Sequence, residues 1–282
     1  MNDLTSGEWL ENNRAQWDER VPLHVASEFY DQSALRAGAG ILYPVEEAEL
    51  AWLFPEGLEG KRVLHLQCHF GADTLVLAQR GATVVGVDFS KPAVQQARAL
   101  AAEVGLADRS RFIEANVYEL RHMLPEPESF DIVYTTWGTI GWLPDVGEWA
   151  RLIAWYLKPG GQLYYADGHP TAWVFDDGDN ELPAFTVPYG AEGVLEFDDG
   201  LTYADESVST EHTKSFEWMH PLSSTVTALL DAGLRLDFLH EHYEVPYRMF
   251  AGLELGADRM YRWPDKKWLP LAVSLAATNP AG

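Results

Sequence analysis

Short β-branched and aliphatic runs alternate with helical stretches from Gly60 onward, and this alternation constrains the fold of the 282-residue chain more than any other feature. The first two runs are 62–66 and 83–87, and each is followed by a stretch with helical spacing. Further strands are predicted at 111–115, 130–135 and 161–166, and helices at 72–80, 93–104 and 146–157. Strands that alternate with helices are typical of βαβ units, so the sequence predicts an α/β domain with a parallel sheet.

The alternation stops after the fifth strand, where residues 168–217 are rich in Asp, Gly, Pro and aromatic side chains without helical period. We predict that this stretch forms hairpins and loops, inserted as a lid on the substrate side. Beyond it, we predict a helix and a strand, then a long aromatic loop and a last strand, at 221–232, 234–240 and 269–277. The chain is thus divided into a helical amino-terminal flap, residues 1–55, and a main domain, residues 56–282.

The formal net charge is −23, because 43 Asp and Glu outnumber 20 Lys and Arg. Proteins that grip nucleic acid neutralise phosphates with Lys and Arg, so this charge argues against DNA, RNA and anionic membranes as partners. The single cysteine, Cys68, allows neither an intramolecular disulfide nor a zinc site built from cysteines. The sequence shows neither a basic and apolar leader nor an apolar run long enough to cross a membrane, so we expect a cytoplasmic protein. We expect a small molecule as its partner and leave its oligomeric state open.

The residues that follow each predicted strand carry the functional signal, because open parallel sheets bind ligands beyond the carboxyl ends of their strands. The first strand leads into Gln67-Cys-His-Phe-Gly71, a turn whose backbone N–H groups could face a ligand. The second ends in Asp88, 17 residues past Gly71, close to the roughly 20 expected for an acid that binds a ribose diol. The third leads to Asn116 and Val117, which could recognise an adenine edge.

Five segments stand in the order and spacing of the class I S-adenosylmethionine-dependent methyltransferases, and the sequence resembles that family over residues 61–168. They are Val63-Leu-His-Leu-Gln-Cys-His-Phe-Gly71, Val84-Val-Gly-Val-Asp-Phe-Ser90, Phe112 to Val117, Phe130-Asp-Ile-Val133 and Leu157-Lys-Pro-Gly-Gly161. The resemblance implies an α/β fold with a doubly wound, mostly parallel sheet of seven strands, the last one antiparallel. The predicted flap and β-rich insertion after strand five are added to this sheet.

By this resemblance the cofactor is S-adenosylmethionine and the product S-adenosylhomocysteine. The first turn would lie under the methionine end, Asp88 would hold the ribose, Asn116 and Val117 would flank the adenine, and Thr135 would line the methionine side. The residues expected to contact the cofactor are Tyr30, Gln67, Cys68, His69, Gly71, Asp88, Phe89, Asn116, Val117 and Thr135.

The first motif departs from the family, which usually carries an acid and three glycines there. This chain has His65, Gln67 and His69, and only the last glycine, Gly71, is present. The variant resembles a bacterial subgroup of small-molecule methyltransferases. A nicotinamide dinucleotide site, the obvious rival, requires Gly-x-Gly-x-x-Gly at this turn and is therefore disfavoured.

Methyl transfer from a sulfonium is an in-line displacement, which needs a base only when the nucleophile carries a proton. Candidate bases are His169, His240 and His242, near the carboxyl ends of predicted strands, and His24 in the flap. A metal site combining Asp167 and His169 with His242 would need two segments that nothing in the sequence brings together, so no metal is expected. The predicted substrate pocket is aromatic, with Trp137, Trp173, Trp218 and Tyr247.

The sequence therefore predicts a methyltransferase that acts on an O, N or C nucleophile of a small, aromatic or hydrophobic metabolite. Two alternatives stay open. The altered first motif would suit a catalytically inactive or regulatory protein that kept the fold, and an acidic surface could receive a basic protein as methylation substrate. The fourth strand leads to Thr135-Thr-Trp-Gly138, which differs from the Asn/Asp-Pro-Pro-Tyr pattern associated with amino methylation of nucleic-acid bases.

Overall fold

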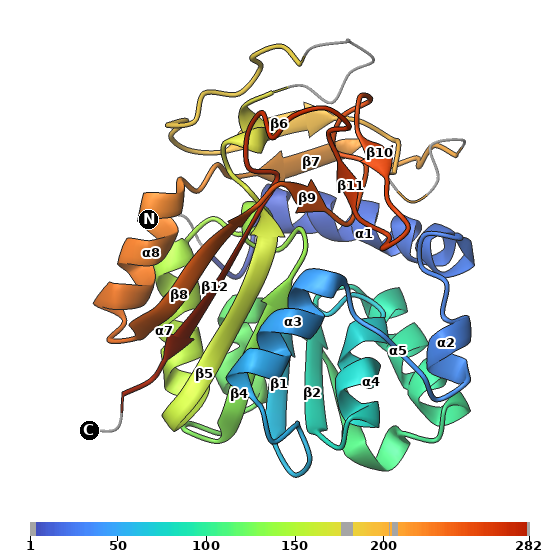
Figure 1. Cartoon of the computed structure of the whole chain (residues 1–282), viewed down its shortest axis with the longest axis vertical. Coiled ribbons are helices and arrows are strands. Elements are labelled where there is room, and N and C mark those ends of the chain that lie inside the picture. Colours follow the sequence, from blue (N-terminus) through green and yellow to red (C-terminus); the bar gives the residue numbers. More distant parts are fainter. Residues whose placement is uncertain (1–3, 176–182, 203, 205–207, 281–282) are drawn as a thin grey trace.

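A seven-stranded sheet with the order β3-β2-β1-β4-β5-β12-β8 forms the centre of the computed structural model, which describes residues 4–175, 183–202, 204 and 208–280 (Figure 1). Its strands are β1 (Arg62–Leu66), β2 (Thr83–Asp88), β3 (Ser110–Glu114), β4 (Phe130–Thr136), β5 (Leu157–Gly168), β8 (Arg235–His242) and β12 (Ala272–Thr278). The pairs among β1 to β5 are parallel, whereas β12 is antiparallel to both β5 and β8. The predicted doubly wound sheet with an antiparallel last strand is confirmed.

Helices cover both faces of this sheet and enclose two separate apolar layers. The main helices are α3 (Pro44–Leu53), α4 (Ala72–Gln79), α5 (Lys91–Glu103), α7 (Val146–Tyr156) and α8 (Leu222–Asp231), with the single turn α6 (Leu120–Met123). One layer holds the fully buried Trp149 and Tyr156 of α7, and the other holds Leu75 and Leu77 of α4. Short 3-10 turns are η1 (Ala107–Arg109), η2 (Val117–Glu119), η3 (Ile140–Trp142) and η4 (Ala172–Val174).

The strand boundaries differ from the sequence prediction at β5 and β12. The Lys158-Pro-Gly-Gly161 segment ends α7 as expected, but β5 already begins at Leu157 because a register shift opposite Phe130 and Ile132 absorbs the irregular residues. The last strand begins at Ala272, three residues later than predicted. It starts beyond Pro270, whose backbone has no N–H to donate to a ladder.

Two small sheets lie above the carboxyl ends of the main sheet (Figure 1). Strands β6 (Leu195–Asp198) and β7 (Lys214–Glu217) pair antiparallel and supply the predicted β-rich insertion. Of the predicted lid, residues 176–182, 203 and 205–207 lie outside the described residues. The second sheet joins β9 (Glu244–Val245), β10 (Glu254–Leu255) and β11 (Tyr261–Arg262). Sequence analysis predicted only a loop there, because strands of two residues have no readable period.

The amino-terminal segment contributes α1 (Glu8–Ala26) and the single turn α2 (Ser33–Arg36), and α1 runs beneath the β6–β7 hairpin (Figure 1). The buried face of α1 is polar, with Asn13, Gln16 and Arg20 at helical spacing. Gln16 Nε2 donates to the carbonyl oxygen of Asp199 at 3.1 Å, and Arg20 Nη2 donates to that of Leu201 at 3.1 Å. The hairpin is therefore held on α1 by side-chain to backbone hydrogen bonds.

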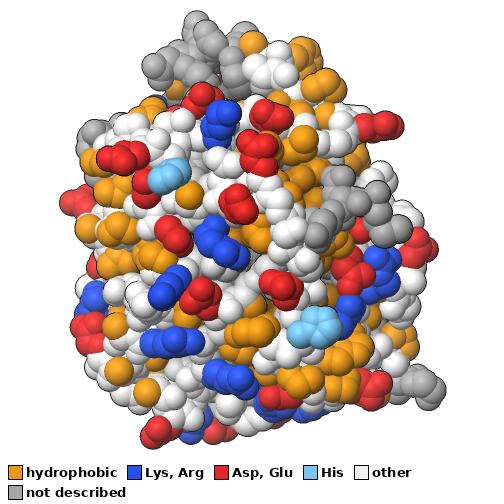
Figure 2. All heavy atoms as spheres, turned by 180° about the vertical axis from the view of Figure 1, so that it is seen from behind, with side chains coloured by type: hydrophobic (Ala, Val, Ile, Leu, Met, Phe, Trp, Pro, Cys, Tyr) orange, Lys and Arg blue, Asp and Glu red, His pale blue; other side chains and the backbone are white. Residues whose placement is uncertain are grey.

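Figure 2 shows that acidic and basic side chains are interspersed on the face opposite to that of Figure 1. The acidic side chains of that face therefore do not gather into a single acidic patch. None of the helices within the described residues has the length and apolar character needed to cross a membrane.

Candidate functional site

A cavity of about 610 Å³ lies at the carboxyl ends of β1, β2, β4 and β5. Its floor is made by the turns that follow these strands, and α1 and the β6–β7 hairpin cover it. This is the crevice in which open α/β sheets bind ligands. Its volume lies within the range of small-molecule sites.

The turn after β1 has a strained backbone and lines the cavity. Gln67 and His69 adopt positive φ angles of 55° and 50°, which non-glycine residues rarely adopt. The side-chain amide of Gln67 donates to the carbonyl oxygen of Thr139 at 2.8 Å and ties the turn to the loop after β4. At Gly71, where α4 begins with φ 76°, an added Cβ would lie 2.6 Å from Cε1 of Phe112. The turn therefore requires glycine at this position.

Asp88 at the end of β2 is buried, and it lines the cavity. Its carboxylate accepts the backbone N–H of His69 at 2.8 Å and that of Ser90 at 2.9 Å. Burial raises the pKa of Asp88 to about 6, against the lowering effect of these N–H donors. Near pH 7 the group is therefore mainly ionised, and a carboxylate of this kind is a strong acceptor for a ligand diol.

The predicted adenine residues also line the cavity, but the side chain of Asn116 is occupied by the protein itself. Its Oδ1 accepts the backbone N–H of Tyr118 at 3.1 Å and caps η2, and its Nδ2 donates to the carbonyl oxygen of Leu4 at 2.8 Å. Val117 follows directly and presents an apolar surface. A ligand at this wall would therefore meet the backbone and Val117 more readily than the Asn116 amide.

Asp167 at the end of β5 is a second buried carboxylate on the cavity wall. It accepts the backbone N–H groups of Gly138 at 2.6 Å, Thr139 at 2.8 Å and Gly168 at 2.7 Å. Burial raises the pKa of Asp167, and these N–H donors oppose that rise. Asp167 thus fixes the loop after β4 by accepting its backbone donors.

The structure brings most of the predicted ligand contacts together around this one cavity. The predicted cofactor residues that line it are Tyr30, Gln67, Cys68, His69, Gly71, Asp88, Phe89, Asn116 and Val117, and the predicted substrate residues that line it are Trp137, Trp173, Trp218 and Tyr247. Thr135 lies buried within β4 instead, and the cavity is lined by its neighbour Thr136. The roles of these residues stay predictions, but their positions are compatible with one another.

Two of the predicted bases, His169 and His242, are buried or half-buried outside the cavity lining. Nδ1 of His169 lies 2.6 Å from the Thr171 hydroxyl, and its Nε2 lies 3.2 Å from a carboxylate oxygen of Glu241. Nε2 of His242 lies 2.8 Å from the hydroxyl of Ser274. Both rings are therefore engaged by neighbouring side chains.

Another predicted base, His24 of α1, is also absent from the cavity lining. Its Nδ1 lies 2.9 Å from Nε2 of His69, and its Nε2 lies 2.6 Å from the hydroxyl of Thr202. Burial lowers the pKa of His24 to about 3, and it lowers the pKa of His69 as well. The two rings are thus neutral and connect the flap, the first turn and the lid.

Glu217 of β7 is a cavity residue that sequence reasoning missed. Burial raises its pKa to about 7, while Ser215 and Arg20 act to lower it. No motif distinguishes this acid from the other acidic residues of the lid, because its burial depends on how the hairpin packs on α1. Within residues 4–175, 183–202, 204 and 208–280, the structure contains no cluster of three or more His, Cys, Asp or Glu residues placed to hold a metal ion.

Comparison with known proteins agrees with this architecture. Residues 63–161 match the family model described as a methyltransferase domain. An S-adenosylmethionine dependent methyltransferase from Mesorhizobium loti shares the fold with a TM-score of 0.57 at 19% identity, over 83% of this chain and 97% of that chain. The chain has the class I methyltransferase fold. A [4+2]-cyclase, SpnF, also shares this methyltransferase fold, with a TM-score of 0.55 at 15% identity over 99% of this chain and 98% of that chain.

The curated proteins similar in sequence include O-methyltransferases. A ubiquinone biosynthesis O-methyltransferase from Pseudomonas fluorescens is 32% identical over 139 residues, or 48% of this chain and 57% of that protein. This chain therefore spans little more than half the length of the curated relatives it matches.

Proposed function

We propose that this protein transfers a methyl group from S-adenosylmethionine to a small, aromatic or hydrophobic molecule. The observation that carries the proposal is one cavity with two unlike walls. Asp88 and the turn Gln67–Gly71 form a polar wall, and tryptophans from α1, the loop after β4 and the lid form the other. The methyltransferase domain match over residues 63–161 supports the same reading.

The residues of the polar wall fit the methyl donor. Asp88 is an ionised acceptor for a ribose diol, and the amino terminus of α4 opens on the same cavity at Ala72 and Asp73. When bound, the donor supplies an electrophilic methyl group on a positively charged sulfur. Aromatic faces such as that of Trp137 and the carboxylates of the cavity favour a positive charge there.

The aromatic wall fits an apolar substrate and excludes water. Trp9 and Trp218 pack edge to face with ring centroids 5.5 Å apart, and Trp17 and Trp142 do so at 5.4 Å. Such surfaces bind flat or hydrophobic molecules and remove water from the reacting atoms. The chain thus positions two reactants in one enclosed space, which is what a displacement reaction requires.

Calorimetric titration with S-adenosylmethionine, S-adenosylhomocysteine and NAD⁺ tests the proposal. Binding of both adenosyl ligands, with no binding of NAD⁺, is the expected result. The folded protein's failure to bind either adenosyl ligand would refute the donor assignment. The cyclase with the same fold shows that the fold alone does not establish methyl transfer, so transfer of labelled methyl groups to small aromatic acceptors is the second measurement.

A further inference from the structure

The β6–β7 hairpin presents one mostly apolar face to the cavity, with a single carboxylate on it. Leu195 pairs with Glu217, and Phe197 pairs with Ser215. Alternate residues of a strand point to the same face of a sheet, and these four residues all line the cavity. Among the paired residues of β6 and β7, Glu217 is therefore the ionisable group that faces the cavity, while Asp199, just beyond β6, also lines it but is exposed.

The backbone on both sides of Glu217 is fixed by other elements. Asn13 of α1 donates from Nδ2 to the carbonyl oxygen of Phe216 at 2.7 Å and accepts its N–H at 2.8 Å. The backbone N–H of Trp218 donates to the carbonyl oxygen of Gly141, in η3, at 2.8 Å. Because both neighbours are anchored, the carboxylate of Glu217 is held in place before a ligand binds.

Glu217 retains more acceptor capacity than the other two buried carboxylates of the cavity. Asp88 and Asp167 already accept two and three backbone N–H groups. Among the described residues, Glu217 accepts one hydrogen bond, from the Ser215 hydroxyl at 3.3 Å. A carboxylate has about four lone-pair sites. Asp73, at the start of α4 beside the polar wall, also lines the cavity and accepts no hydrogen bond from the described residues. On the lid side of the cavity, where Asp199 is exposed, Glu217 is therefore the half-buried acid with free acceptor capacity for a substrate.

The charges that surround Glu217 also restrict the substrate. Arg20 of α1 is the charged residue whose field reaches Glu217, and it is the only Lys or Arg among the described residues that line the cavity. Its guanidinium already donates to the carbonyl oxygen of Leu201 and lies 5.4 Å from the ring of Trp17. A phosphate or carboxylate on the substrate would meet mainly acidic neighbours, so the cavity disfavours an anionic substrate.

We propose that Glu217 binds the hydroxyl group of a neutral aromatic or hydrophobic substrate and accepts its proton during methyl transfer. The inference rests on the proposed function and names the acceptor atom as oxygen. The hydroxyl proton moves to the Glu217 carboxylate as the oxygen–methyl bond forms and the methyl–sulfur bond breaks. The electron pair of the broken bond stays with sulfur, and Glu217 later releases the proton to water.

The burial of Glu217 supports this role. Its pKa of about 7 lets the group be a carboxylate at neutral pH and still hold the transferred proton. A base of this kind contributes roughly 10²–10⁴-fold to the rate. Glu196 on the opposite, exposed face of the same hairpin provides the matched control.

The experiment compares the wild type with Glu217→Gln and Glu196→Gln, each saturated with S-adenosylhomocysteine. Calorimetric titration uses 2-naphthol as the hydroxyl probe and 2-naphthylmethylamine as the amine probe. We expect 2-naphthol to bind at least about 5-fold more weakly to Glu217→Gln and equally to Glu196→Gln and the wild type. Transfer of labelled methyl from S-adenosylmethionine to 2-naphthol should fall at least about 100-fold in Glu217→Gln. The rise of the wild-type rate through about pH 7 should vanish in that variant.

The outcomes separate this inference from the proposed function. Binding of S-adenosylhomocysteine with equal 2-naphthol affinity in the wild type and Glu217→Gln would overturn the role of Glu217 and leave the donor site intact. Tighter binding of the amine than of 2-naphthol, or no 2-naphthol binding at all, would overturn the hydroxyl assignment. Absence of S-adenosylhomocysteine binding would instead overturn the proposed function on which the inference rests.

Discussion

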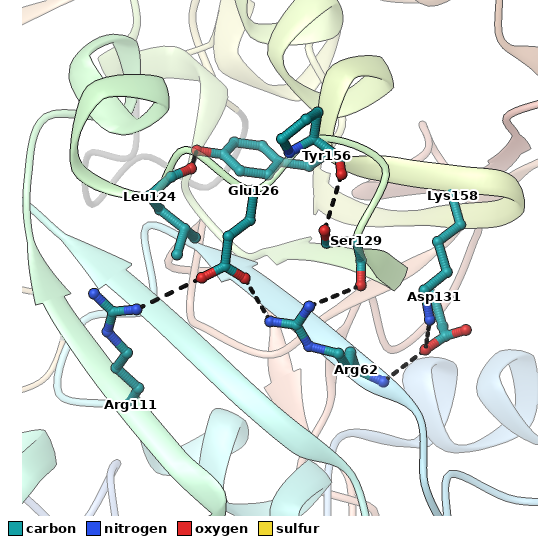
Figure 3. A network of polar contacts seen from close by, with 9 residues as sticks. Arg62, Arg111, Leu124, Glu126, Ser129, Asp131, Tyr156 and Lys158 are labelled. Atoms are coloured by element: carbon teal, nitrogen blue, oxygen red, sulfur yellow. Dashed lines mark hydrogen bonds and ion pairs between the residues drawn. The ribbon is translucent and has the colours of Figure 1, made fainter.

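The two ends of the main sheet satisfy their charged groups in different ways. At the amino end, opposite charges pair at the surface (Figure 3). Arg62 Nη2 lies 2.7 Å from Glu126, and Nζ of Lys158 lies 2.9 Å from Asp131. Burial acts to raise the pKa of Asp131, but the backbone N–H of Arg62 and the Lys158 ammonium lower it below the usual value. Charge at this end therefore supports folding.

At the carboxyl end, buried acids are satisfied by backbone N–H groups and not by cations. Asp88 and Asp167 accept five such donors between them. Of the described non-glycine residues with positive φ, Gln67, His69 and Trp137 lie in the turns of this end. Strained backbone and buried negative charge without a cation lower the free energy of unfolding. The carboxyl end is therefore arranged to bind a ligand, and this arrangement lowers the stability of the fold.

The largest expected effect that would sharpen this comparison concerns the glycine at the start of α4. Gly71→Ala should lower the free energy of unfolding by roughly 2–5 kcal/mol, because a positive φ of 76° is combined with a contact of 2.6 Å to Phe112. Gly105→Ala is the matched control, since its φ is 72° but nothing lies within 4 Å of the added Cβ. Its loss should be only about 1–2 kcal/mol. Urea unfolding measures both, and equal losses would mean that the turn has room to relax.

The second prediction addresses the carboxylate at the end of β2. Asp88→Ala should weaken S-adenosylhomocysteine binding by at least about 100-fold, because charge-assisted hydrogen bonds contribute roughly 1.5–3 kcal/mol each. The variant also leaves the N–H groups of His69 and Ser90 without their acceptor, so circular dichroism must show that it is folded. If Asp88→Ala is not folded, Asp88→Asn, which retains one acceptor oxygen, is measured in its place. Asp131→Ala at the amino end should bind the ligand normally, and an equal loss there would erase the distinction between the two ends.

The third prediction concerns pH and Glu46, a buried acid of α3. Burial, with Asp73 as a negative neighbour, raises the pKa of Glu46 from 4.5 to about 8. The folded protein then binds more protons than the unfolded chain between these values, so stability falls as pH rises from about 4.5 to about 8. Glu46→Gln removes this ionisation.

We expect the unfolding free energy of the wild type to decrease more steeply from pH 5 to pH 8 than that of Glu46→Gln, by about 1–2 kcal/mol. The amino end should behave in the opposite sense. Because the pKa of Asp131 is lowered, its contribution is present above about pH 4 and is lost as pH falls further. Parallel pH profiles for the wild type and Glu46→Gln would show that Glu46 is not kept protonated by its burial.

Local periodicity predicted the strands of the main sheet, and the resemblance to the methyltransferase family implied that the sheet is doubly wound with an antiparallel last strand. Asp88 and Gly71 could be found in this way, since Asp88 ends β2 and Gly71 lies in the turn that follows β1. The helical character of 1–55 was also predictable, but its packing was not. The buried face of α1 carries Asn13 and Gln16, and polar side chains give no amphipathic signal to read.

The base candidates illustrate the limit more sharply. Histidines near strand ends were the reasonable choice by residue type, but a side chain's reach depends on tertiary packing. His169 lies against Thr171 and Glu241, whereas Glu217 lines the cavity because the insertion folds back over α1. The contact between Asn13 and Phe216 joins residues 203 positions apart, and no local pattern encodes such a distance.

The smallest expected effect concerns Arg62 at the amino end of the sheet. A large effect of its substitution would contradict the distinction between the two ends. Arg62 donates to the carbonyl oxygen of Ser129 at 3.2 Å, and its guanidinium lies 4.7 Å from the ring centroid of Phe130, in addition to its ion pair with Glu126 (Figure 3). About a third of each charged side chain is exposed, so water and salt screen the pair. Arg62→Met should therefore lower the free energy of unfolding by only about 0.5–1 kcal/mol, and by less in 1 M salt.

Binding of S-adenosylhomocysteine should be unchanged in Arg62→Met, because no part of the amino-end network lines the cavity among the described residues. Calorimetry at low and high salt, together with urea unfolding, measures both quantities on the same preparation. A loss of affinity in this variant would show that charge at the amino end reaches the ligand site through the strands. The two ends would then be energetically coupled. Charges that stabilise the fold could no longer be distinguished from charges that bind the ligand.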